Sequence, residues 1–425
     1  MVRLRAAVLA SLAVLFSTTS AISTTSAAGF LSEDGTVGFA LNVPQADDDN
    51  DLYFTFNGPS SSSWIAVGMG SSQMDNSLIF MMYADSTGTN ITLSPRYGGG
   101  NYEPEHTKDV IVHVMPGSQV VNGRMTANVR CEQCLTWPGG SVDTANTKAP
   151  FMFARGPEQD FTSNSVSASV KRHAHYGSFT LDLTKALGTK AVPNADYADS
   201  AGTVQLSAKD DKDLAPPFHA FFMLFAFVGV MPIGVLILRI LDRPKWHGIN
   251  QAISVLLALA GVGLGFYIGT LYQRTRSFTS AHQIFGIIIM AMLIGELIVG
   301  FLHHRMYMLT RIPTILTKIH IWIGRVVISC GIANGFLGFP LALNRKYNWA
   351  LLILVGLVLG VAAPFLFWRY RRNIQKKRTA SGVRHMEDTG YEDQPWNSGM
   401  PTHSFTDLRH MQNYPLQNTK PQQGR

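Results

Sequence analysis

The chain has 425 residues, enough for two or three domains, and its mean hydropathy of +0.09 averages two very different regions. Residues 29–217 carry 21 acidic and 12 basic residues, a net charge of −9, whereas residues 218–425 carry 7 acidic and 21 basic residues, a net charge of +14. Because the basic residues border apolar segments instead of forming one soluble patch, the composition argues against a nucleic-acid-binding protein.

The N-terminus, residues 1–28, has the pattern of a secretory signal peptide. Arg3 and Arg5 precede an apolar run from Ala6 to Phe16, and small residues follow, with cleavage expected near Ala21 or Ala28. The run is too short to span a membrane. The sequence therefore predicts that the region after it is exported.

Residues 29–190 are predicted to fold as an all-β sandwich, because short β-rich runs recur between turn-rich stretches. The predicted strands are Val37–Val43, Leu52–Asn57, Trp64–Gly70, Leu78–Ala84, Val110–Met115, Met125–Arg130, Phe151–Arg155 and Ser178–Leu183. Asn90 opens an Asn-Ile-Thr glycosylation sequon, which fits an exported loop. Residues 191–217 are polar and end in Pro216-Pro217, so they are expected to form a linker.

Cys131 and Cys134 lie in the exported region and are expected to form a short-loop disulfide. The alternative, a zinc site, lacks further cysteine or histidine ligands nearby. The remaining cysteine, Cys330, lies in an apolar segment and is expected to be a packing residue.

Residues 218–370 are predicted to hold five transmembrane helices, at about 218–240, 249–271, 281–302, 319–341 and 350–368. The flanks on one side of the membrane are rich in Lys and Arg, and the positive-inside rule makes this side cytoplasmic. These flanking residues are Arg239, Arg243, Lys245, Arg305, Arg311, Lys318, Arg369, Arg371, Arg372, Lys376, Lys377 and Arg378. The signal peptide independently places the β domain outside, so residues 371–425 are expected to be a disordered cytoplasmic tail.

Four histidines lie near the ends of four of these helices. His219 and His282 open the first and third helices from the outer side, whereas His247 and His320 precede or open the second and fourth from the inner side. Polar residues at membrane depth usually face the interior of a bundle and are functional candidates. The pattern predicts two histidine pairs at two depths, each able to supply both axial ligands of a haem. Histidines that merely anchor helix ends are the alternative.

Other polar residues in the helices have less specific interpretations. His303 and His304 also lie at an inner helix end and are expected to be interfacial, although either would be a rival ligand. Glu296 is expected to bond a neighbouring helix, with a proton relay as the alternative. Arg325 lies just over one turn beyond His320 and is a candidate partner for a haem propionate. Several small residues permit close approach of helices or of a macrocycle: Gly261, Gly263, Gly265, Gly295 and Gly300.

The helical region resembles the cytochrome b561 family over about 150 residues. The resemblance consists of an ordered set of segments: His219-Ala220, Met231-Pro232-Ile233-Gly234, Trp246-His247, Asn250-Gln251, Ala281-His282-Gln283 and Ile319-His320-Ile321-Trp322-Ile323-Gly324-Arg325. It implies two b-type haems between four helices, with ligands from alternate helices. The pairs His219 with His282 and His247 with His320 match that arrangement.

The exported region resembles the cytochrome domain of cellobiose dehydrogenase, a DOMON-type sandwich. The resemblance is carried by residues 131–141, residues 68–76 and residues 173–182. It implies one further b-type haem with a Met and a His ligand, and by position these are Met74 and His173. Met69 and His175 are the competing residues, and His113 is expected to be a core residue.

Together these features predict a transmembrane haem oxidoreductase. By resemblance to the family, a cytoplasmic ascorbate-like reductant would donate electrons, and an extracellular ferric or cupric chelate or a secreted redox enzyme would accept them. The inner Lys and Arg residues could attract an anionic reductant, although the positive-inside rule already explains them. The alternative is a membrane-anchored DOMON protein that binds a sugar or catechol and signals. No nicotinamide or flavin fingerprint is present in the sequence, and a homodimer is left open.

Overall fold

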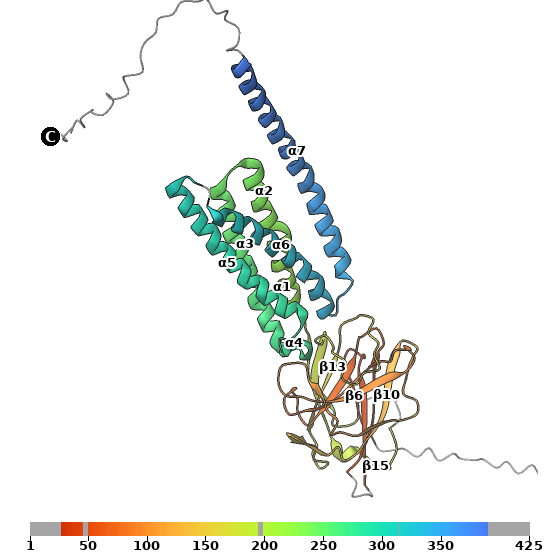
Figure 1. Cartoon of the computed structure of the whole chain (residues 1–425). Coiled ribbons are helices and arrows are strands. Elements are labelled where there is room, and N and C mark those ends of the chain that lie inside the picture. The colour runs from red at the N-terminus through yellow and green to blue at the C-terminus, as the bar shows by residue number, and fades with distance from the viewer. Residues whose placement is uncertain (1–26, 46–49, 194–198, 313, 390–425) are drawn as a thin grey trace, which may run out of the picture. The chain divides into compact units, whose positions relative to one another are not determined.

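The computed structural model describes residues 27–45, 50–193, 199–312 and 314–389, and Figure 1 shows its strands and helices. Most of the predicted signal peptide, residues 1–26, lies outside these ranges. Ala28 already belongs to the first strand, where it is fully buried and pairs with Leu41.

The N-terminal region contains two seven-stranded sheets and a small hairpin. The first sheet has the order β1-β2-β3-β10-β8, with β15 added beside β2 and β9 beside β10; the second has the order β16-β14-β13-β4-β5-β6-β7. The strands of the first sheet are β1 (Ala28–Leu31), β2 (Gly38–Pro44), β3 (Leu52–Pro59), β8 (Val112–Val114), β9 (Gln119–Val121), β10 (Arg124–Cys131) and β15 (Leu187–Gly188). Those of the second are β4 (Ile65–Met69), β5 (Leu78–Ala84), β6 (Ile91–Tyr97), β7 (Glu105–His106), β13 (Ala149–Arg155), β14 (His175–Leu181) and β16 (Val204–Asp210). The hairpin pairs β11 (Thr136–Trp137) with β12 (Gly140–Ser141), and the 3-10 helix η1 spans Leu183–Lys185.

Aromatic side chains from the two sheets meet in one buried core. Phe30 stacks on Phe179 with ring centroids 3.7 Å apart, and Phe54 lies 4.6 Å from Phe80. Each pair joins a strand of the first sheet to a strand of the second. Apolar residues that alternate along the strands face inward and pack between the two sheets, as the burial pattern of β10 illustrates. The two packed sheets confirm the predicted β-sandwich.

Six strands of the two sheets are absent from the sequence prediction: β1, β6, β7, β9, β15 and β16. The longest of them, β6 and β16, have seven residues each. β6 contains Pro95 and Arg96, which hide its strand pattern, yet Arg96 is fully buried and donates to Ser94, Pro104 and Ala168. β16 lies inside residues 191–217, which were expected to be a linker, and it pairs with β14. Its exposed, polar residues are typical of an edge strand. The linker prediction is therefore wrong for residues 204–210.

The C-terminal region, as far as it is described, consists of helices, and five of its helical stretches are long and apolar enough to cross a membrane. They are built from α1 (Ala215–Leu224), the π-helix η2 (Phe225–Val230), α2 (Met231–Leu241), α3 (Pro244–Leu271), α4 (Gln273–Arg276), α5 (Ala281–Thr310), α6 (Ile315–Leu341) and α7 (Tyr347–Thr389). The α1–η2–α2 stretch, α3, α5 and α6 form the bundle labelled in Figure 1. This confirms the five predicted apolar helices.

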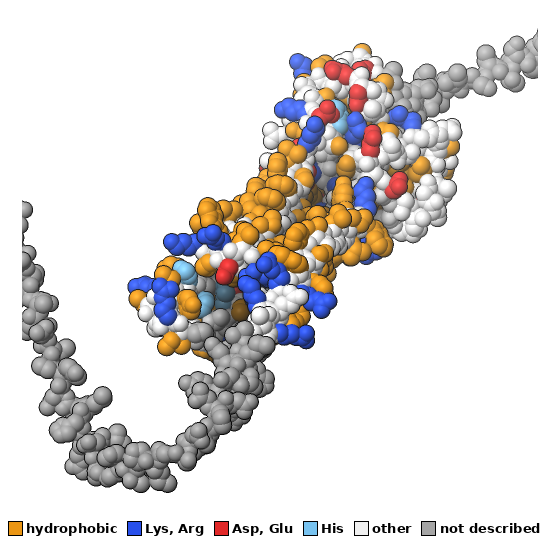
Figure 2. All heavy atoms as spheres, turned by 90° about the horizontal axis from the view of Figure 1, so that it is seen from above, with side chains coloured by type: hydrophobic (Ala, Val, Ile, Leu, Met, Phe, Trp, Pro, Cys, Tyr) orange, Lys and Arg blue, Asp and Glu red, His pale blue; other side chains and the backbone are white. Residues whose placement is uncertain are grey.

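Hydrophobic side chains cover the outside of the helical region in a broad band, as Figure 2 shows for one face, and Lys and Arg gather beyond it. Many large apolar residues of α3, α5, α6 and α7 are exposed, as expected for surfaces that face lipid. Cys330 packs against the helical core, as expected. α7 continues to Thr389, further than the expected start of the tail at residue 371, and residues 390–425 lie outside the described ranges.

Candidate haem sites between the helices

His219 and His282 face each other across the bundle. His219 lies on α1 and His282 on α5, and their ring centroids are 6.0 Å apart with the ring planes at 89°. Both rings come from the first two turns of helices that begin on the side of the β domain. The structure thus brings together the residues that the sequence placed at one level.

His247 and His320 form the second pair, at the opposite end of the bundle. His247 lies on α3 and His320 on α6, with ring centroids 6.3 Å apart and planes at 81°. α3 and α6 begin where α1–η2–α2 and α5 end, so the two pairs are separated by most of the length of the helices.

The geometry of each pair fits a six-coordinate haem iron. An iron bonded to two imidazole nitrogens, each at about 2 Å, holds the ring centroids roughly 6 Å apart. Both observed separations agree with this spacing. In both pairs, the ligand atom has to be Nε2, because Nδ1 of every one of the four rings is already engaged.

The partners of the four Nδ1 atoms are all acceptors. His219 Nδ1 lies 2.6 Å from the carbonyl oxygen of Gly261, and His247 Nδ1 lies 2.8 Å from that of Gly234. His282 Nδ1 lies 3.0 Å from the carbonyl oxygen of Asn334 and 3.1 Å from its side-chain oxygen. His320 Nδ1 lies 2.8 Å from Oε1 of Glu296. For His219, His247 and His282 the oxygen accepts a hydrogen bond, so Nδ1 donates and Nε2 keeps a free lone pair, which is the tautomer that a metal needs. For His320 the carboxylate oxygen approaches Nδ1 at an ion-pair distance without hydrogen-bond geometry, and it leaves Nε2 as the open ring nitrogen.

Glycines pack against three of the imidazoles. A Cβ atom at Gly265, Gly338 or Gly300 would lie 3.0, 2.9 or 2.8 Å from Cε1 of His219, His282 or His320, respectively. A side chain at any of these positions would push the imidazole out of place. Gly265 and Gly300 were among the small residues singled out in the sequence, whereas Gly263 and Gly295 of that set meet open space.

The remaining polar candidates lie as follows. Glu296 of α5 bonds His320 of α6, in agreement with the expectation that it contacts a neighbouring helix. His303 stacks against His320 with centroids 6.4 Å apart, and its Nδ1 lies 3.3 Å from Thr317 Oγ1. Arg325 is exposed and lies 5.0 Å from the ring centroid of Trp322. Among the described residues, no contact links Arg325 to either histidine pair.

In the β domain, Met74 and His173 lie in loops beyond the ends of different strands. Met74 follows the Met69 end of β4, and its carbonyl oxygen accepts from the side chain of Ser77, just before β5. His173 precedes β14, which begins beside the Ile65 end of β4 through Arg155. Strand register does not fix the positions of these two loop side chains, so the Met74–His173 ligand pair stays a prediction.

The neighbours of these residues are polar. His173 Nδ1 lies 3.2 Å from Oδ2 of Asp211, and burial lowers the pKa of the His173 imidazole. His175 instead bonds Asp210, with Nδ1 2.9 Å from Oδ1. Met69, the competing methionine, is buried in the core. His113 is half exposed and bonds Glu132, so the prediction that it is a core residue is wrong.

Cys131 and Cys134 form the expected disulfide, which closes the turn after β10. Asn90 is exposed in the β5–β6 hairpin, where a glycan would meet no obstacle from the sandwich core.

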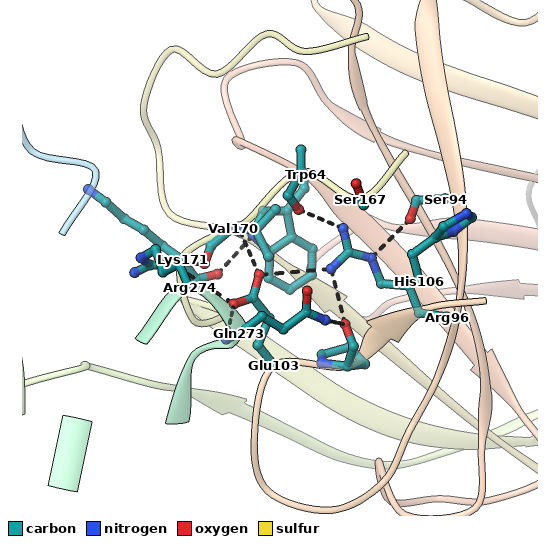
Figure 3. A network of polar contacts seen from close by, with 12 residues as sticks. Trp64, Ser94, Arg96, Glu103, His106, Ser167, Val170, Lys171, Gln273 and Arg274 are labelled. Atoms are coloured by element: carbon teal, nitrogen blue, oxygen red, sulfur yellow. Dashed lines mark hydrogen bonds and ion pairs between the residues drawn. The ribbon is translucent and has the colours of Figure 1, made fainter. Parts of the chain in front are cut away.

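A polar network joins the β domain to the adjacent helix ends (Figure 3). Glu103 is its centre: its Oε1 accepts from the backbone N–H of Val170 at 2.8 Å, and its Oε2 accepts from that of Gln273 at 3.0 Å. Its carboxylate also lies 3.9 Å from Arg96 and 3.8 Å from Arg274. Lys171 donates to Asn344 at 2.7 Å. The histidine pair His219–His282 is therefore the pair on the β-domain side.

Comparisons with known proteins agree with this division. The family model described as the cytochrome domain of cellobiose dehydrogenase matches residues 16–191, and the model described as eukaryotic cytochrome b561 matches residues 218–344. A pyrroloquinoline quinone-dependent pyranose dehydrogenase from Coprinopsis cinerea is 28% identical over 137 residues, which are 32% of this chain and 18% of the relative. The chain thus spans less than a fifth of the length of that curated relative.

Two solved structures are similar to the β domain. The cytochrome b domain of pyranose dehydrogenase from Coprinopsis cinerea has 20% identity and a TM-score of 0.34, and the cytochrome domain of Myriococcum thermophilum cellobiose dehydrogenase has 14% identity and a TM-score of 0.31. Each comparison covers 39% of this chain and 92% of the solved chain. By the two family models alone, the chain contains a region that matches the cytochrome domain of cellobiose dehydrogenase, followed by a region that matches eukaryotic cytochrome b561, and both matches support haem binding.

Proposed function

We propose that the protein transfers electrons across a membrane, from a reductant on the Lys- and Arg-rich side to an acceptor on the side of the β domain. The observation that carries this proposal is the presence of two histidine pairs at opposite ends of the bundle, with centroid separations of 6.0 and 6.3 Å. When bound there, b-type haems supply reversible one-electron chemistry. The protein supplies the ligands, their tautomers and a medium of low polarity.

The histidines and glycines have separate tasks in this proposal. His219 with His282, and His247 with His320, are the axial ligands of two haems. The carbonyl oxygens of Gly261, Gly234 and Asn334 hold the rings in the ligating tautomer. Arg325 stays a candidate partner for a propionate only if it leaves Trp322.

The donor and the acceptor follow from chemistry and topology. The inner flanks Lys245, Arg305, Arg311 and Lys318 suit an anionic cytoplasmic reductant such as ascorbate. On the other side, the cytochrome domain suits a ferric or cupric chelate or a secreted redox enzyme. That the similar cytochrome domains belong to pyranose and cellobiose dehydrogenases supports an oxidoreductase as partner.

The test is haem content with difference spectra of purified variants. Wild type should show b-type bands that ascorbate reduces, and His219→Ala or His320→Ala should each remove one haem while leaving the other. An exposed histidine, His113, provides the control, since His113→Ala should leave every band unchanged. Full haem content in both ligand variants would refute the assignment.

The same measurement decides whether the β domain holds a third haem. Its family match supports such a haem, with Met74 and His173 as the candidate ligands. No electron-transfer step is based on this pair before that measurement. Loss of one haem of three in a Met74→Ala, His173→Ala double variant would establish the pair, and two haems in both proteins would exclude it.

A further inference from the structure

One of the four imidazoles differs from the others in the charge of its Nδ1 partner. Nδ1 of His219, His247 and His282 meets neutral carbonyl oxygens, and His282 also meets a neutral amide. Nδ1 of His320 instead lies 2.8 Å from a carboxylate oxygen of Glu296. The two proposed haem sites are therefore unequal.

The surroundings of Glu296 direct its carboxylate at His320. The Glu296 side chain is only 11% exposed, and within the described residues it forms no ion pair with Lys or Arg. Its Oε2 atom is buried without a hydrogen-bond partner. On the facing helix α6, the absence of a side chain at Gly324 provides space for the Glu296 carboxylate, since a Cβ there would lie 2.8 Å from Oε1.

A negative charge beside Nδ1 changes the ligand chemically. Although the contact lacks hydrogen-bond geometry, the negative charge 2.8 Å from the ring stabilises oxidised over reduced iron. The effect is larger in a medium of low dielectric constant than at an exposed surface. The neutral carbonyl oxygens beside the other three imidazoles carry no such charge.

We propose that Glu296 is a positioning residue that lowers the reduction potential of the haem held by His247 and His320 relative to the haem held by His219 and His282. This inference rests on the proposed function and deepens it, because it gives the electron a direction. With haems bound, the His247–His320 site would hold the one-electron donor and the His219–His282 site the one-electron acceptor. Glu296 favours that transfer toward the β-domain side.

The experiment compares two isosteric variants by redox titration of the purified, haem-loaded protein. Glu296→Gln keeps the shape of the side chain and removes its charge, so it should raise the reduction potential of the haem held by His247 and His320. The expected change is about tenfold in the ratio of reduced to oxidised haem, which equals about 59 mV for one electron. Asn334→Asp is the reciprocal variant, because it places a carboxylate oxygen where the amide oxygen lies 3.1 Å from His282 Nδ1. It should lower the reduction potential of the haem held by His219 and His282.

The outcomes separate this inference from the proposed function. Opposite shifts, each confined to one haem, support it. Unchanged potentials in Glu296→Gln, or equal shifts of both haems, overturn it while leaving the haem sites intact. If Glu296→Gln loses a haem, Asn334→Asp decides alone: an unchanged potential at the His219–His282 site overturns the inference. Absence of two membrane haems in wild type would instead refute the proposed function itself.

Discussion

Glu103 and Glu105 are two residues apart, and both contact arginines of the helical region, yet their surroundings differ. Glu103 is almost completely buried and lies near Arg96 and Arg274, and Arg96 is itself fully buried. Burial lowers the pKa of the Arg96 guanidinium, which shows that its charge depends on compensation. Glu105 pairs with Arg276 at 2.9 Å but remains largely exposed.

We therefore expect Glu103→Ala to destabilise the protein by about 3 to 5 kcal/mol, because it leaves a buried arginine without its anion. Glu105→Ala is the matched control and should cost at most about 1 kcal/mol, since solvent screens an exposed pair. Thermal unfolding of the detergent-solubilised variants measures both. Equal midpoints for the two variants would show that the Glu103 network adds no stability.

Among the helices, the first membrane stretch is interrupted by the π-helix η2, just before Pro232. Wide turns of this kind occur where the regular hydrogen-bond ladder is disturbed. Asn250 and Gln251 of α3 donate to the carbonyl oxygens of Val230 and Met231 at 2.6 and 3.1 Å. These contacts explain two amides in an apolar helix, and they fix α3 against the irregular stretch.

The packing of α6 against η2 depends on the absence of a side chain at Gly331. A Cβ there would lie only 2.1 Å from the ring of Phe227, which is buried. Gly331→Ala should therefore lower the free energy of unfolding by about 1 to 3 kcal/mol through overpacking. Gly295→Ala, whose Cβ meets open space, should not destabilise. Thermal unfolding monitored through haem absorbance compares the two, and the packing argument fails if both behave alike.

At the scale of the whole molecule, the division of charge predicts the orientation. We expect the acidic β domain and the basic flanks of the helices to lie on opposite sides of one membrane. This orientation requires export of the sandwich. The exposed Asn90 offers a direct readout of that export.

We expect glycosylation at Asn90, since it opens the single Asn-x-Ser/Thr sequon of the sequence. Asn90→Gln should abolish the mobility shift produced by an endoglycosidase in protein from eukaryotic cells. Thr92→Ser is the matched control, because it keeps the sequon and a hydroxyl that donates to Ser163. A shift that persists in Asn90→Gln, or never appears in wild type, would contradict the predicted orientation or the use of this site.

Much of the architecture follows from local sequence. Apolar length determines the five membrane helices, since each must cross about 30 Å of hydrocarbon. Helix direction then alternates, so the levels of His219, His247, His282 and His320 can be derived without coordinates. Strand alternation likewise predicts most of the longer strands of the sandwich and misses the short ones β1, β7, β9 and β15. Among the longer strands it fails for β6, where a buried Arg96 interrupts the apolar pattern, and for β16, an edge strand with polar residues.

Only the tertiary structure decided which side chains meet. The contact between Glu296 and His320 depends on the rotation and approach of α5 and α6, which helical periodicity within one segment cannot specify. Likewise, only the packing of the helices shows that Gly265, Gly300 and Gly338 make room for imidazole rings. Hydropathy acts along the chain, whereas hydrogen bonds and steric contacts act between segments that only folding brings together.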